Sequence, residues 1–114
     1  MTDHEATHHR DVSEALLLRR LVGGDPGAVD RVLALAPGSE SASLLVAAAL
    51  LSGDATYVAR ATARAGTVRE RQLVSLADAH LRGDAELLDV LVRDHLADHP
   101  DHLLAAWIAA RTKE

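Results

Sequence analysis

The chain has 114 residues, of which 48% are apolar and 25% are charged, and its net charge is −5. This length fits one domain that buries about two-thirds of its surface, and the composition argues against disorder. The absence of cysteine excludes disulfides, thiol catalysis and cysteine zinc sites. The acidic balance and the 2% aromatic content disfavour nucleic acid as a partner.

Residues 1–10 contain no apolar run of the kind found in signal peptides, so we expect a flexible N-terminal tail. A single helical-repeat domain is expected over 11–114. The most apolar run, 42–51, is half as long as the roughly 20 residues that a bilayer requires, so no membrane contact is expected. Eleven arginines against one lysine are typical of a GC-rich bacterial genome. We therefore expect a cytoplasmic bacterial protein.

Apolar periodicity and capping residues predict an all-α chain without strands. The first helix is expected to begin at the capping box Asp11–Glu14, the third after Ser39, and the fifth at the capping box Thr67–Glu70. The third helix is apolar nearly all round and should be the most buried. The seven expected helices span 12–22, 26–36, 40–52, 55–65, 68–82, 85–98 and 101–112.

The dipeptide Gly-Asp occurs three times, at 24–25, 53–54 and 83–84, each time between two predicted helices. Glycine can take the left-handed conformation that ends one helix, and aspartate can cap the next. An apolar lattice repeats with these turns at positions 5, 8, 9 and 12 after each glycine. The pattern predicts a right-handed array of three antiparallel helical hairpins with the last helix as a C-terminal cap.

This arrangement resembles the tetratricopeptide-repeat (TPR) family and its α-solenoid relatives. The resemblance rests on the Gly-Asp turns, on Ala36 and Ala65 in the second helices, and on Pro100 at the end of a repeat. The first two copies are four or five residues shorter than the family repeat, and the bulky aromatic positions of its first helices are not aromatic here. A divergent repeat and an unrelated helical-hairpin array fit equally well.

The resemblance implies a concave groove, lined by the first helices of the hairpins, that binds a peptide. The groove would be apolar with an acidic rim, to which Glu14 also contributes, and it lacks the basic clamp that some family members use for a C-terminal carboxylate. The candidate partner-binding residues are Leu18, Leu21, Glu40, Ala47, Leu50, Glu70, Leu73, Ala77 and His80.

Three histidines near the C-terminus form a speculative metal site. His95 and His99 are one helical turn apart, and His102 follows Pro100 and could fold back as a third ligand. The alternative is that His95, which holds an apolar lattice position, points into the core. His80 also holds such a position and is expected to be structural.

Three further motifs have structural alternatives. His4–His8 reads HExxH, but so close to the N-terminus a solvated tail that binds nickel or copper weakly or not at all is expected. Arg82–Asp84 reads RGD, yet it falls on a predicted helix turn. Trp107 lies on the apolar stripe of the last helix, as core or as a partner anchor.

Phosphate loops, nucleophile elbows and paired carboxylates are missing from the sequence, so we expect no enzyme and no cofactor. The sequence favours an adaptor or scaffold that binds a protein or peptide. The alternatives are a homo-oligomeric structural protein, such as a homodimer that covers the apolar ends, and a metal-binding accessory protein.

Overall fold

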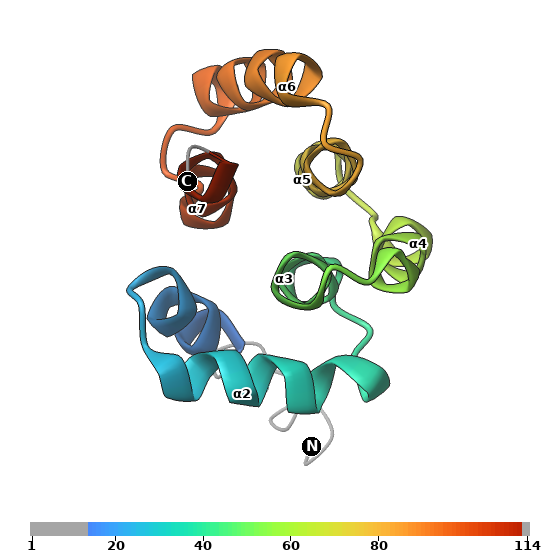
Figure 1. The fold of residues 1–114 in the computed structure, drawn as a ribbon, viewed down its shortest axis with the longest axis vertical. Helices are drawn as coiled ribbons and strands as arrows, with labels where there is room; N and C mark the ends of the chain where they lie inside the picture. The colour runs from blue at the N-terminus through green and yellow to red at the C-terminus, as the bar shows by residue number, and fades with distance from the viewer. Residues whose placement is uncertain (1–13, 113–114) are drawn as a thin grey trace, which may run out of the picture.

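The computed structural model describes residues 14–112, and these fold into consecutive helices joined by short turns (Figure 1). The expected all-α class is confirmed, and the helix ends that the structure describes lie within two residues of their predicted positions. The predicted start of the first helix at residue 12 and residues 11–13 of its capping box lie outside the described residues. The tail and the HExxH motif lie outside the described residues. A helical segment at 14–22 is followed by α2 (Pro26–Leu35), the 3₁₀ turn η1 (Ala36–Gly38), α3 (Ala42–Ser52), α4 (Ala55–Arg64), α5 (Val68–Leu81), α6 (Ala85–Asp98) and α7 (Leu103–Thr112).

The Gly-Asp turns have the geometry that the sequence predicts. Each glycine has a φ in the left-handed region, between 73° and 90°. Each aspartate side chain accepts a hydrogen bond from a backbone N–H in the first turn of the next helix, which satisfies a donor that would otherwise have no partner. The three pairs are Asp25 with Gly27, Asp54 with Thr56, and Asp84 with Leu87.

Capping residues also fix the starts of α3 and α5. The Thr67–Glu70 capping box is present as predicted. The cap of α3, however, is Ser41, whose hydroxyl accepts from the Leu44 N–H, so the prediction that Ser39 caps this helix is wrong. Ser39 instead accepts from the Ser41 N–H in the preceding turn. Sequence alone does not separate two serines that are two residues apart, because both can cap a helix.

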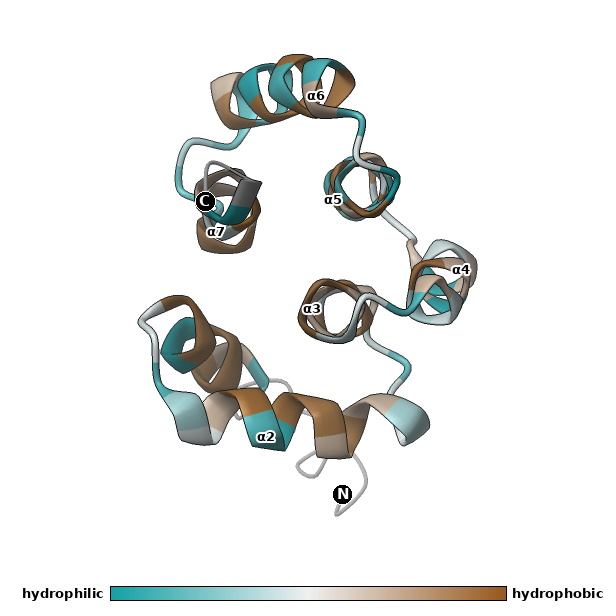
Figure 2. Ribbon diagram, viewed as in Figure 1, coloured by the Kyte–Doolittle hydropathy of each residue, from teal (hydrophilic) through white to brown (hydrophobic). Residues whose placement is uncertain are grey.

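α3, α5 and α7 lie side by side, and α4 and α6 pack outside them (Figure 1). α3 also contacts α2, α4 and α7, so neighbours surround it. Eight of its eleven residues are buried, from Ala42 to Leu50 with Ser43 half-buried. The expectation that this helix is the most buried is confirmed, and Figure 2 shows that its ribbon is predominantly hydrophobic. The core therefore forms around α3.

Arg60, on α4, ties the turn between α2 and α3 to the fold. Its guanidinium donates to three backbone carbonyls, those of Ala36 at 3.1 Å, Pro37 at 3.1 Å and Ser39 at 3.0 Å. The Ala36 carbonyl also accepts from the Ser39 N–H at the end of η1, so Arg60 adds a second donor there. One side chain thus closes the connection between the first two pairs of helices.

Replacing Arg60 with Met should lower the free energy of unfolding by about 1–2 kcal/mol, because the three carbonyls lose a charged donor while the aliphatic stem remains. Chemical denaturation monitored by circular dichroism measures this change. Arg71→Met is the matched control, since Arg71 is exposed, and it should change stability by less than about 0.5 kcal/mol. Equal stabilities of the two variants would contradict the role of Arg60.

Within residues 14–112, no single helix has the length and apolar character needed to cross a membrane. Taken together, α2 with η1 and α3 have the length and apolar composition of a membrane span, but the two parts are bent by 118° relative to each other. This likeness concerns length and composition only.

Candidate functional site

The predicted groove is closed in this structure. Five of its residues, Leu21, Ala47, Leu50, Leu73 and Ala77, are at most 5% exposed and belong to one core cluster. The expectation that they form an accessible floor is therefore not met. The reason is that α7 packs against both α5 and α3 on this side, and the alanines let the helices approach closely.

The remaining groove residues have separate environments. Leu18 is half-buried. Glu40 is exposed, with a carboxylate oxygen 3.6 Å from the Arg64 guanidinium. Glu70 is held in the capping box, where one carboxylate oxygen accepts from the backbone N–H groups of Gly66 and Thr67. His80 is half-buried, and burial followed by the charge of Arg111 lowers its pKa. Leu18 and Glu70 line one cavity, described below, and Glu40 and His80 do not line it.

The three C-terminal histidines are brought together, as the sequence predicts. The ring centroids of His99 and His102 each lie 4.9 Å from that of His95. His95 is 1% exposed and His102 is 8% exposed, so two of the rings are interior. The core alternative for His95 is therefore the one that the structure supports.

A hydrogen-bond chain links Gln72, His95 and His102. His95 Nδ1 lies 2.7 Å from Gln72 Oε1, and His95 Nε2 lies 2.6 Å from His102 Nδ1. The amide oxygen can only accept, so Nδ1 of His95 carries a proton and donates. In a neutral His95 ring, Nε2 then accepts from the Nδ1–H of His102. These two hydrogen bonds join α5 and α6 to the start of α7.

The hydrogen bonds occupy both ring nitrogens of His95 and Nδ1 of His102. Two imidazole nitrogens bound to one tetrahedral zinc lie about 3.3 Å apart, which is longer than the hydrogen bond between His95 and His102. Within residues 14–112, no three histidine, aspartate or glutamate side chains are arranged to hold a metal ion. Metal binding by His95, His99 and His102 would have to break the hydrogen bonds that anchor α7.

The environment keeps the two buried histidines neutral. Burial, followed by the positive charges of Arg69 and the other histidines, lowers the pKa of His102 to about 4. Burial also lowers the pKa of His95, and His99 and Arg69 add to this effect while Asp98 opposes it. Both rings are therefore neutral at pH 7. The donor and acceptor pattern of the hydrogen bonds between Gln72, His95 and His102 requires this.

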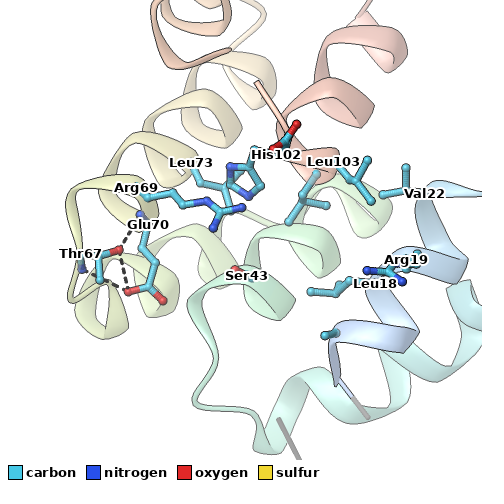
Figure 3. Close-up of a pocket in the computed structure, with 13 residues that line it drawn as sticks. Leu18, Arg19, Val22, Ser43, Thr67, Arg69, Glu70, Leu73, His102 and Leu103 are labelled. Atoms are coloured by element: carbon cyan, nitrogen blue, oxygen red, sulfur yellow. Dashed lines mark hydrogen bonds between the residues drawn. The ribbon is translucent and has the colours of Figure 1, made fainter. Parts of the chain in front are cut away.

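A cavity of about 570 Å³ lies where α3, α5 and α7 begin, beside the helical segment 14–22 (Figure 3). This cavity is hereafter called the pocket. In Figure 3 the Arg69 side chain extends towards the His102 ring. The lining residues are Ala15, Leu18, Arg19, Val22, Ser43, Thr67, Arg69, Glu70, Leu73, Asp101, His102, Leu103 and Leu104.

The pocket combines aliphatic walls with two unpaired cations. Among the described residues, Arg19 and Arg69 form no ion pair, whereas Arg64, Arg82 and Arg93 do. Two carboxylates, Glu70 and Asp101, also line the pocket, so the formal charges of its lining balance. The volume lies within the range of about 300–1,000 Å³ that is typical of binding cavities. The pocket can therefore hold an aliphatic group next to polar groups of either charge.

Sequence reasoning named Leu18, Glu70 and Leu73, which line the pocket, but it did not find the pocket itself. The pocket depends on three helix starts meeting in space, and Thr67, His102 and the residues around Leu103 come from distant parts of the chain. Local spacing carries no signal for such a meeting. That Arg19 and Arg69 lie at the same cavity is likewise visible only in the structure.

The RGD string forms a helix turn, and Trp107 packs partly against the core. Arg82 pairs with Asp78 at 3.0 Å, and Asp84 caps α6, so the string forms the predicted turn. Trp107 is half-buried against the core, with the Arg111 guanidinium 4.8 Å from its ring centroid.

Comparison of the chain with known protein families, with curated proteins and with solved structures finds no match.

Proposed function

We propose that this chain is a small protein-interaction module, an adaptor or scaffold without catalytic activity, and that its helices form a divergent TPR-like array. Support for the array comes from the packing of α3, α5 and α7 against one another and from the three Gly-Asp turns. Support for a binding role comes from the pocket, which takes the place of the closed groove as the candidate contact surface.

The observation that carries this proposal is the combination of an open aliphatic cavity and an exposed leucine at its edge. Leu103 is 48% exposed and lines the pocket together with the half-buried Leu18 and Val22. A partner side chain that enters the pocket would bury these groups, at about 25 cal/mol per Å² of apolar surface. Arg19, Arg69 and Asp101 at the pocket would then pair with charged groups that flank the aliphatic residue of the partner.

Leu103→Glu tests the proposal, because it places a negative charge at the edge of the pocket without disturbing the core. We expect this variant to lose captured proteins that the wild type retains in extracts of the source cells, as measured by quantitative mass spectrometry. Leu35→Glu is the matched control, since Leu35 is 38% exposed on α2 and does not line the pocket. An unchanged set of captured proteins for Leu103→Glu would reject the pocket as the contact surface.

A further inference from the structure

The histidines within residues 14–112 all lie on α7's neighbours or at its start. His80 is on α5, His95 is in the last turn of α6, His99 ends that helix, and His102 precedes α7, whereas α2, α3 and α4 contain no histidine. α7 packs against α5, α6 and α3 (Figure 1). Histidine is the side chain that ordinarily titrates between about pH 5 and 8. Mild acid therefore adds charge around α7 and not within α2, α3 or α4.

The hydrogen bond between α6 and α7 can survive one added proton but not two. The neutral His95 ring donates through Nδ1 to Gln72 and accepts at Nε2 from the Nδ1–H of His102. With one added proton, one of the two facing nitrogens can still accept. With a proton on both rings, both facing nitrogens carry hydrogens and repel each other. His95 Nδ1 still donates to Gln72, so α6 stays joined to α5 and only the bond to α7 is lost.

The surroundings of the two rings oppose their protonation while α7 is docked. Burial is the largest cause that lowers both pKa values, Arg69 and His99 add to it, and Asp98 opposes it at His95. The pocket beside His102 contributes the other charged or polar groups, which come from the segment 14–22, α3, α5 and the turn before α7: Arg19, Ser43, Glu70 and Asp101. Release of α7 exposes the rings to water and removes the cost of burying their charge.

We propose that proton uptake by His95 and His102 releases α7 from α3 and α5 while the other described helices stay folded. α7 is joined to α6 through the single turn 99–102, so it can move away without breaking another connection between described helices. Release uncovers buried apolar residues on both sides of the contact, which are Ala47, Leu73, Ala77, Leu104, Ala105 and Ile108. The predicted groove is then closed at neutral pH and open in mild acid.

The other connections of the fold keep their charges in this pH range. Aspartates cap α2, α4 and α6, and Arg60 holds the turn before α3. Neither kind of side chain ordinarily changes its charge between about pH 6.5 and 5. The pKa of His102, by contrast, rises from about 4 towards 6.5 when α7 leaves, so released α7 binds more protons. Docking is therefore most stable above pH 6.5 and weakens first as the pH falls.

Trp107 reports the position of α7, because it is the only tryptophan of the chain and lies half-buried on this helix. We expect its emission maximum to shift to longer wavelength between about pH 6.5 and 4.5, while far-UV circular dichroism keeps most of its helical signal. A dye that binds exposed apolar surface should bind in the same range. EDTA in all samples removes metal ions. Simultaneous loss of both signals, or a constant emission maximum down to about pH 4, would overturn the inference.

His102→Asn assigns the transition to the histidine pair. The asparagine keeps a donor near the position of Nδ1 but does not titrate, so the midpoint of the Trp107 shift should fall by about half a pH unit or more. His99→Asn is the control, since the His99 ring forms no hydrogen bond within residues 14–112, and its midpoint should move less. A midpoint for His102→Asn equal to that of the wild type would contradict the inference.

Arg69→Met gives a second test that does not alter the hydrogen bonds. It removes an exposed charge that opposes protonation of both rings, so the midpoint should fall by a few tenths of a pH unit. Arg71→Met is the control, because Arg71 is exposed on the same helix and does not line the pocket, and it should leave the midpoint unchanged. If His102→Asn is unfolded at neutral pH, this pair decides, and equal midpoints for the two arginine variants would refute the release of α7 by protonation.

Discussion

Replacing Leu50 with Asp should unfold the chain. Leu50 is 5% exposed on α3, the helix that contacts α2, α4, α5 and α7. The substitution removes about 2 kcal/mol of apolar burial and adds the cost of an unpaired polar group in the core, which is about 2–7 kcal/mol. The sum is comparable to the whole stability of a small domain, about 5–15 kcal/mol. Helical content at 25 °C and the thermal unfolding midpoint, both from circular dichroism, measure the outcome.

Leu103→Glu is the control for this experiment, because it also introduces an acid in place of leucine, but at a side chain that is 48% exposed. Its unfolding midpoint should stay close to that of the wild type. If Leu50→Asp instead kept full helicity and lost only partner binding, Leu50 would line an open groove and the closed arrangement would be refuted. The pair therefore separates a core residue from a surface residue of the same type.

The local elements of this fold could be predicted from the sequence because their causes are local. A glycine followed by aspartate fixes a turn within four residues, and all three turns have the predicted φ and caps. The capping box at Thr67 and the uniform apolar character of α3 are likewise properties of single segments. Helix boundaries follow from these features without knowledge of the tertiary contacts.

Whether the groove is open or covered by another helix could not be predicted from the sequence in the same way. Periodicity shows that Leu73 and Ala77 share one face of α5, but it does not show whether another helix covers that face. The packing of α7 against α3 and α5 decides this, and it brings together segments that are far apart in the sequence. Alanines at 47 and 77, on the face where a groove was expected, are consistent with close helix packing.

The hydrogen-bond partners of the histidine cluster could not be predicted from the sequence either. The spacing of His95, His99 and His102 correctly predicts that the rings meet. It does not predict that Gln72, 23 positions before His95, supplies the oxygen that accepts from His95 Nδ1 and so sets the direction of both hydrogen bonds. With that acceptor in place, the nitrogens bond to each other, and the cluster serves to anchor α7 in the core.

Acidification should destabilise this protein through the buried histidines. The pKa of His102 is lowered to about 4 in the folded chain from 6.5, so between these values the unfolded chain binds more protons. The stabilisation is therefore complete above pH 6.5 and is lost as the pH falls towards 4. The loss from His102 is about 3 kcal/mol, and His95 and His80 contribute in the same direction. Urea denaturation at a series of pH values measures it.

His102→Asn isolates the contribution of this ring, because the asparagine amide can donate near the position of Nδ1 but does not titrate. The free energy of unfolding of His102→Asn should fall less steeply than that of the wild type between pH 6.5 and 4. His99→Asn is the matched control, since the His99 ring forms no hydrogen bond within the described part of the chain, and it should keep most of the wild-type slope. Carboxylate protonation affects all three proteins alike, so the difference between slopes reports the histidine. Parallel slopes for His102→Asn and the wild type would show that the hydrogen-bond chain does not couple proton binding to the docking of α7.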